Sequence, residues 1–545
     1  MSRWLSSWPW FGLVSVTVIA SPNFTYEPFD NIKLLVLGIT AAFAFAEFLA
    51  SQQIRLKFSM NWYVIPLIFL FALVNPLMFS DAPFSQQIYG AAGRSLGFFH
   101  YFFLFCIFLG MVASKGILKP INFFKVLIAT GLFEAVYSLM QYLSIDPIIW
   151  DNSNDWIFGT FGNPNFLSAF LGLSACASLF PRRFQFTRNW CYLSYINVTV
   201  SIFVIIISGS IQGLFIFCLG FSLLIIYLIF HRSKVLGVST AFFSLILATF
   251  ISLGVLGKGV MAKFVYQDST TFRGDYWRAG FRMFKDNLLT GVGLDSYGDN
   301  YRLYRDAVAA NRRGLDLYSN SAHNIFIDLA STGGIFLLLT YIAFVLFIFV
   351  SGYSKLKKSN FNNQSLVILI ILWLGFQAQL LISINVSSVA IWGFAIAGLI
   401  VREDASMDDI PTVRVRSKKS RVSQLDNRTV VYLGIFLPLF VAIVFPLFLR
   451  DVQLANAISS SSKDKLIAAT TSWPQSCYYL AKTEEALTQV EDFQNSLAVS
   501  QKSVSLNNKC FDSWRHIYEN PVSSENFKID AWKKMLELDP NLRTN

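Results

Sequence analysis

The chain has 545 residues, of which 54% are hydrophobic and only 14% are charged. A soluble domain carries about 25% charged residues, so this composition excludes an ordinary soluble protein and predicts an all-α polytopic membrane protein. The formal net charge of +11 does not indicate nucleic-acid binding, because the Lys and Arg residues lie mainly in short segments between apolar stretches, where they set membrane orientation.

Apolar stretches long enough to cross a bilayer as helices, about 20 residues each, recur along the sequence. Thirteen spans are predicted, at 8–21, 31–50, 61–79, 95–113, 121–143, 163–180, 190–208, 211–230, 236–256, 331–352, 364–384, 386–401 and 430–449. The segments between them are alternately basic and non-basic. The positive-inside rule then predicts a cytoplasmic N-terminus and an extracytoplasmic C-terminus.

The spans divide the chain into four predicted parts. Residues 1–401 form a twelve-span body, whose one long polar interval, 257–330, is an extracytoplasmic loop. Residues 402–429 are polar, mix charges and lack apolar periodicity, which is typical of a flexible cytoplasmic linker. Residues 430–449 are an extra transmembrane helix, and 451–545 are an extracytoplasmic helical tail.

The tail shows a weak repeat of about 33 residues and ends in ELDPN, a pattern that resembles tetratricopeptide repeats. Such a tail suggests a protein partner. If Cys477 and Cys510 occupy equivalent positions in stacked helix pairs, their backbones lie about 10 Å apart, too far for a disulfide. The alternative is a disulfide on an extracytoplasmic domain.

The loop contains the first candidate for chemistry, His323, which is followed by Asn324 just before an apolar run. A neutral imidazole can accept a proton from a hydroxyl near pH 7, and the Asn can hold that imidazole or a sugar hydroxyl. The chain has four His residues, and His323 alone is predicted to be both outside and beside an arginine-rich loop.

Arginines of the loop are the second set of candidates. Arg273 and Arg278 fall in FRGDYWRAGFRMFKD, an amphipathic segment, and a guanidinium offers a rigid donor fork that suits phosphate oxygens. Asp275, between them, is a secondary candidate. Membrane headgroup contact is the simpler interpretation for some of the remaining loop arginines, which are Arg302, Arg305, Arg312 and Arg313.

Other predicted outer turns supply four further candidates. Arg94 lies at the outer start of a span, where the positive-inside rule does not require a cation; it is either functional or extended to outer phosphates. Asn163 and Asn165, in GTFGNPNF, could meet a sugar or could simply cap a helix. Gln212 is the one strongly polar side chain of the turn SGSIQG.

No CxxC motif, Cys/His cluster or carboxylate pair marks a metal site in the sequence. Cys106, Cys176, Cys191 and Cys218 lie in or beside apolar spans, as small buried hydrophobes do. We expect neither a metal nor a cofactor.

Three short motifs, in this order, resemble the O-antigen ligase and polymerase superfamily. They are GTFGNPNF, then Arg273-x-x-x-Trp277 with Gly291-Val292-Gly293, then His323-Asn324-x9-Gly334. Leu337 stands where many members have another Gly, and Gln212 is the nearest polar group where many have an Arg. Because Gln212 stands in place of that Arg, the turn SGSIQG does not supply one of the two arginines that would bind the pyrophosphate. Arg94 could supply the missing positive charge.

The resemblance implies a glycosyltransferase of the cytoplasmic (inner) membrane. Such enzymes transfer a glycan from a polyprenyl-pyrophosphate carrier to an acceptor hydroxyl on the outer face, and the acceptor is a glycan, a lipid or a protein. Arg273 and His323 would then be catalytic, and Arg94, Asn324, Arg278, Asn163, Asn165, Gln212 and Asp275 would bind substrate. The alternative is a flippase or transporter of lipid-linked oligosaccharides, which predicts ionisable residues deep in the spans.

Overall fold

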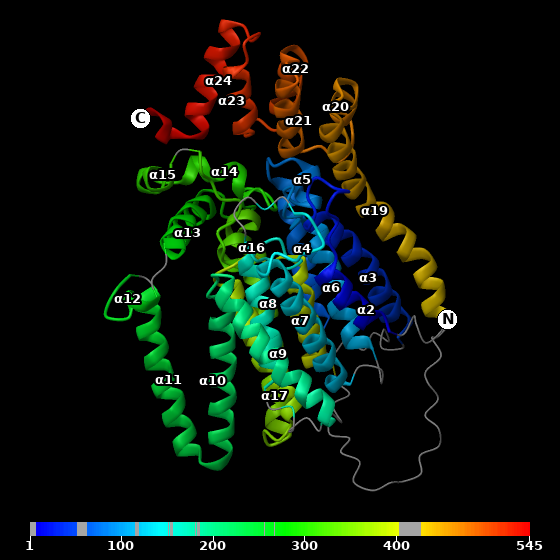
Figure 1. Cartoon of the computed structure of the whole chain (residues 1–545), viewed down its shortest axis with the longest axis vertical. Helices are drawn as coiled ribbons and strands as arrows, with labels where there is room; N and C mark the ends of the chain where they lie inside the picture. The colour runs from blue at the N-terminus through cyan, green and yellow to red at the C-terminus, as the bar shows by residue number, and fades with distance from the viewer. Residues whose placement is uncertain are drawn as a thin grey trace.

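The computed structural model describes residues 7–51, 63–114, 119–150, 152, 156–179, 181, 186–255, 257–265, 268–314, 316–402 and 427–544. Helices make up nearly all of the regular structure in these ranges, and no strand occurs in them (Figure 1). Together with the apolar helices described next, this arrangement confirms the predicted fold class, an all-α polytopic membrane protein.

Each predicted span corresponds to an apolar helix. These helices are α2 (Trp8–Val18), α3 (Asp30–Ala50), α4 (Val64–Phe79), α6 (Phe98–Ala113), α7 (Pro120–Tyr142), α8 (Pro164–Ala177), α9 (Arg188–Ile207), α10 (Gln212–Arg232), α11 (Lys234–Val255), α16 (Ile325–Lys358), α17 (Gln364–Leu380), α18 (Ser387–Val401) and α19 (Asn427–Ser460). Seven of them are long and apolar enough to cross a membrane, and the other six are shorter.

The centre and the rim of this helical body differ in what covers their apolar side chains. Every residue of α18 is buried, and α18 packs against α2, α6, α16 and α17. By contrast, α11 is apolar but largely exposed, with Val235 76% and Phe243 68% accessible. An apolar helix that exposes its side chains in this way is suited to lipid rather than to water.

Several helix boundaries differ from the prediction by a few residues or more, and two of the differences bear on the loop and the tail. The tenth predicted span begins at Ile325 rather than at residue 331, because Asn324 caps the helix with its side chain. The thirteenth continues to Ser460 rather than ending at 449. Arg450 and Asp451, which the sequence suggests should leave the membrane, are fully buried against the tail and remain helical.

The polar interval before α16 forms short helices, which are α12 (Ala262–Val265), α13 (Asp268–Asp286), α14 (Tyr297–Tyr304) and α15 (Ala307–Arg313). The tail consists of α20 (Lys463–Ala469), α21 (Cys477–Gln489), α22 (Phe493–Leu506), α23 (Phe511–Glu519), α24 (Glu525–Leu538) and η2 (Pro540–Thr544). Both sets, with α5 (Phe84–Tyr89), lie at the same end of the body (Figure 1). Residues 403–426 of the predicted linker lie outside the described residues.

In the tail, α21, α22, α23 and α24 each pack on the next. Packing of consecutive helices alone does not test the resemblance to tetratricopeptide repeats, which stays a prediction. Cys477 and Cys510 form a disulfide with their Cα atoms 5.7 Å apart, so the expectation of 10 Å was wrong. The reason is that one cysteine opens α21 and the other caps α23, so the two helix starts approach more closely than packed helix axes do.

Candidate functional site

The glycines of the second motif fasten the loop to the membrane body. The N–H of Val292 donates to the carbonyl of Ser331 at 2.8 Å, and that of Gly293 donates to Thr332 at 3.1 Å. Gly291 has a φ of 65°, and a Cβ there would lie only 2.3 Å from the backbone carbon of Thr332. These residues are therefore a close backbone joint between the end of α13 and α16.

Gly334 completes this joint from the side of α16. Its φ of 75° and ψ of −171° interrupt the helix, a conformation that only glycine adopts readily. The interruption lets the N–H of Ile335 donate to the carbonyl of Leu288 at 2.8 Å. The glycine of the His-Asn-x9-Gly motif thus has a structural role that positions the loop.

The His323 turn is held in a strained backbone conformation at the start of α16. His323 has a φ of 54°, which is uncommon for a residue with a side chain. Asn324 accepts hydrogen bonds from the N–H groups of Phe326 and Ile327, and its amide donates to the carbonyl of Leu381 at 3.1 Å. The side chain of Asn324 is therefore engaged in fixing the turn.

Asp328 is a residue of this turn that sequence reasoning missed. Its carboxylate accepts from the N–H of Ala322 at 2.6 Å and from the hydroxyl of Ser321 at 2.8 Å. The same Ser321 oxygen accepts from the N–H of His323 at 2.9 Å. An Asp in the first turn of a helix, four residues after a capping Asn, is the signal that could have identified it.

The His323 imidazole rests on an aromatic side chain of α13. Its ring stacks on Tyr276 with centroids 5.5 Å apart and an interplanar angle of 28°. Tyr276 is buried, and its carbonyl accepts from the hydroxyl of Tyr297 at 2.6 Å. Arg273 precedes Tyr276 by one helical turn. The helix α13 therefore carries both the tyrosine on which His323 stacks and the candidate arginine.

Some of the loop arginines are paired with acidic side chains of the loop itself. Asp275, 2% exposed, pairs with Arg278 at 2.5 Å and with Arg312 at 2.6 Å. Arg278 also pairs with Asp306 at 3.0 Å. The side chains of Asp275 and Arg278, both predicted to bind substrate, are thus occupied in tying α13 to α15.

Arg273 differs from these paired arginines. Within the described ranges, no carboxylate lies within ion-pair distance of it and no hydrogen bond of its guanidinium occurs. Burial lowers the pKa of this guanidinium from its ordinary value. A half-buried cation without a protein counter-charge favours an anion in its place.

Two other loop arginines do not contact membrane headgroups, although the sequence suggested such contact for some of this group. Arg302 and Arg305 are 6% and 4% exposed, and both lie against Asp539 of the tail. Headgroup contact was therefore wrong for both, because the tail covers them.

Arg94 is brought to the loop by Asp295, which follows the Gly-x-Gly motif. The carboxylate of Asp295 accepts from the N–H groups of Ala91 at 2.7 Å and Leu96 at 3.1 Å, which closes the turn that carries Arg94. Burial raises the pKa of Asp295 to about 7, against the opposing effects of these two hydrogen bonds and of the Arg94 charge. The Arg94 charge also acts on Asp328, so the sequence-distant Arg94 and His323 turns are neighbours.

A small pocket with a mixed apolar and polar lining lies between these two turns. Its volume is about 30 Å³, room for a water molecule or two, and Asp295 and Asp328 both line it with Tyr297 and Ser321. The two carboxylates thus each hold one turn and meet at one pocket. Among the described residues, no group of three His, Cys, Asp or Glu side chains is placed to hold a metal ion.

Asn163, Asn165 and Gln212 belong to a separate junction. Asn163 caps α8, and the Asn165 oxygen accepts from the hydroxyl of Ser210 at 2.8 Å. Gln212 is 2% exposed, and its amide has no hydrogen-bond partner within the described part of the chain. None of the three lines the pocket. The capping interpretation therefore describes Asn163, and Gln212 is the member of this group left with unused polar atoms.

Fold and site together define a polytopic membrane protein whose charged site lies in the long loop between two membrane helices. Residues 196–342, from α9 through the loop into α16, match the family model described as O-antigen ligase. The chain therefore carries an O-antigen ligase domain, which confirms the resemblance to the O-antigen ligase and polymerase superfamily. The match includes Arg273, His323 and Gly334 and leaves out Arg94 and the tail. No curated protein matches the chain significantly.

Proposed function

We propose that the protein is a membrane glycosyltransferase that moves a glycan from a polyprenyl-pyrophosphate carrier to an acceptor hydroxyl on the outer face of the cytoplasmic membrane. The observation that carries the proposal is the pairing pattern of α13. Arg278 is paired with Asp275 and Asp306, whereas Arg273, one turn before Tyr276, has no acidic partner among the described residues. A phosphate-bearing substrate suits this free cation.

In the proposed reaction, His323 takes up the proton and the two arginines stabilise the charge of the leaving group. The acceptor oxygen attacks the anomeric carbon, and the bond from that carbon to the pyrophosphate oxygen breaks. The hydroxyl proton passes to the neutral imidazole of His323. The leaving polyprenyl pyrophosphate keeps the electron pair, and the Arg273 and Arg94 guanidiniums stabilise its negative charge.

Two features support an extracytoplasmic position for the site. The loop and the tail lie at the same end of the body, and α19 runs toward that end from Asn427, which in the sequence follows most of the basic segment 402–429 (Figure 1). The tail also contains the Cys477–Cys510 disulfide, and disulfides persist mainly in oxidising compartments.

The flippase alternative predicts ionisable residues deep in the spans, and two such residues are buried inside the helical body. Lys33, a residue of α3, donates to the carbonyl of Thr160 at 2.7 Å. Glu134 accepts from the Thr160 hydroxyl at 2.7 Å. Both charges hold the GTFGNPNF turn in place, which favours a bracing role over a transport path.

Replacement of His323 tests the proposal in cells. His323→Ala should abolish surface glycan in the native host at normal protein level, and glycan linked to the carrier should accumulate. Lys285→Ala, an exposed cation on the same α13, is the matched control and should leave surface glycan unchanged. Normal surface glycan in the His323 variant would sink the proposed site. Accumulated single units or long chains would distinguish a polymerase from a ligase.

A further inference from the structure

The end of the tail binds the loop through a buried charge. Asp539, which follows α24, is fully buried, and its carboxylate accepts from Arg305 at the end of α14. Arg302 of α14 lies 3.7 Å from the same carboxylate. One tail carboxylate therefore contacts two buried loop arginines.

The same two arginines also hold the backbone that leads to His323. Arg302 donates to the carbonyl of Asp316 at 3.2 Å, and Arg305 donates to that of Leu317 at 2.8 Å. A guanidinium has several donors in a rigid plane, so it can bind a carboxylate and a carbonyl at once. Arg305 thus links Asp539 to a carbonyl six residues before His323.

Arg302 makes a second link between the tail and this segment. Its guanidinium lies 4.1 Å from the ring centroid of Phe511, the first residue of α23, and 5.3 Å from that of Tyr318. Both contacts are of the cation–π kind. Arg515 of α23 adds an ion pair with Asp316 at 2.8 Å.

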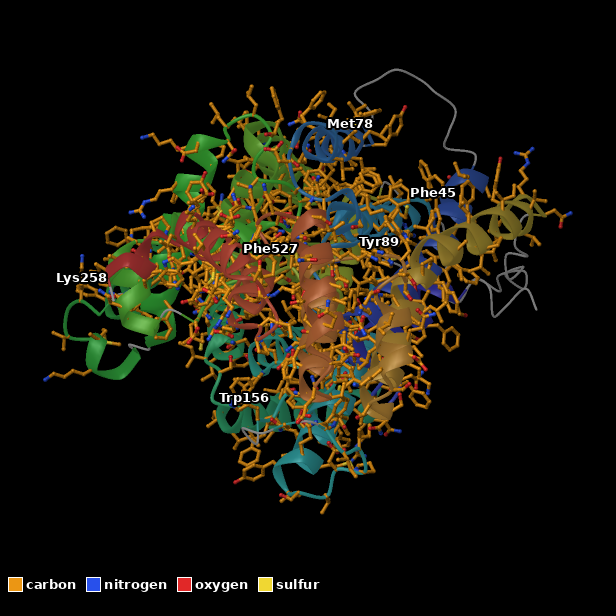
Figure 2. The ribbon with its side chains drawn as sticks, turned by 90° about the horizontal axis from the view of Figure 1, so that it is seen from above. Phe45, Met78, Tyr89, Trp156, Lys258 and Phe527 are labelled. Atoms are coloured by element: carbon orange, nitrogen blue, oxygen red, sulfur yellow. A yellow bond between two sulfur atoms is a disulfide. The ribbon has the colours of Figure 1, made fainter. Side chains whose placement is uncertain are left out.

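The view from above places the tail over the body. Seen along this direction, Phe527 of α24 lies over the middle of the molecule, whereas Lys258 lies at the rim (Figure 2). The tail is therefore seated on the end of the body that carries the site. This placement differs from that of a separate module joined only by α19.

We propose that the tail sets the position of the His323 turn and that Asp539 is a positioning residue for glycan transfer. The inference rests on the proposed function for the role of His323. Loss of the Asp539 charge removes the buried carboxylate that Arg302 and Arg305 share, and removing one partner of a buried ion pair is strongly destabilising. The two guanidiniums then shift and weaken their hydrogen bonds to the carbonyls of residues 316 and 317. A displacement of about 1 Å at a reacting group can slow a reaction by about 100-fold.

Asp539→Asn in the full-length protein tests the proposal by two measurements. Amide hydrogen exchange of residues 314–322 should rise, while that of α21 and α22 stays unchanged. In a transfer assay, kcat should fall by about 10- to 100-fold with an unchanged KM for the lipid-linked donor, because the donor cations are not displaced. Glu537→Gln removes an exposed carboxylate two residues away on α24, and it should match the wild type in both.

Each outcome decides the matter. Unchanged exchange in 314–322 overturns the link between the tail and the loop, and raised exchange with an unchanged kcat overturns the positioning role. If the wild type transfers no glycan, the proposed function fails, and the exchange measurement still decides whether the tail holds the loop. If Asp539→Asn does not fold, Phe511→Leu, which removes one ring contact of Arg302, must raise exchange in the same segment.

Discussion

At the residue scale, the site depends on which charges are already neutralised within the protein. The sequence predicts Arg273 and Arg278 as equivalent phosphate ligands on one amphipathic segment. The structure shows that Asp275 and Asp306 neutralise Arg278, and that Arg273 has no such partner within the described ranges. The i, i+3 spacing of Asp275 and Arg278 is a local signal that could have separated the two arginines. Asp306 lies 28 residues from Arg278, so no local pattern could predict that second pair.

A buried acid in the tail gives a prediction about pH. Burial raises the pKa of Glu484 to about 8, with an opposing hydrogen bond from Ser513, whereas an unfolded Glu ionises near pH 4.3. The folded tail therefore binds a proton that the unfolded tail loses, and its stability decreases as pH rises from about 4.3 to about 8.

We therefore expect the amides of α21 in the full-length protein to be less protected from hydrogen exchange at pH 8 than at pH 6, after correction for the intrinsic exchange rates. Glu484→Gln should remove most of this difference, because the amide does not ionise. The same pH dependence in both proteins would show that another group causes it.

At the element scale, the helices were largely predictable and the joints between them were not. Apolar length alone locates the spans, because a membrane helix must satisfy its backbone within itself. The start of α16 and the extension of α19 depend on the Asn324 cap and on contacts with the tail. A residue pattern within one segment does not contain such contacts.

The joint at Gly334 gives a prediction that separates backbone strain from crowding. Gly334→Ala places a Cβ 2.4 Å from the carbonyl oxygen of Leu289 at a φ of 75°. We expect it to lower the free energy of unfolding by about 3 kcal/mol or more, through strain and the loss of the joint.

Gly209→Ala is the matched control for this substitution. Gly209 has a φ of 70°, but a Cβ added there would meet no atom within 4 Å, so only strain of about 1 kcal/mol is expected. Thermal unfolding of both variants in detergent compares the two. Equal losses would show that the approach of Leu289 contributes nothing.

At the scale of the whole molecule, the sequence predicts the all-α membrane class and the O-antigen ligase resemblance, and both are confirmed. It also singles out His323, which stacks on Tyr276, and Arg273, which precedes Tyr276 by one helical turn on α13. It does not predict Asp295 or Asp539, each of which holds a segment distant in sequence, nor Asp328, which holds the neighbouring His323 turn. The tail was expected to serve a partner, and its contacts with the loop became visible only in three dimensions.

The most direct test of the account is glycan transfer by the purified protein in lipid vesicles that contain a polyprenyl-pyrophosphate-linked glycan and an acceptor. Wild type should release free polyprenyl pyrophosphate as the acceptor gains glycan. Arg273→Ala should slow this release by about 10²- to 10³-fold, and Lys285→Ala should not change it. Equal release by Arg273→Ala and wild type, or movement of the lipid across the vesicle without transfer, would contradict the account.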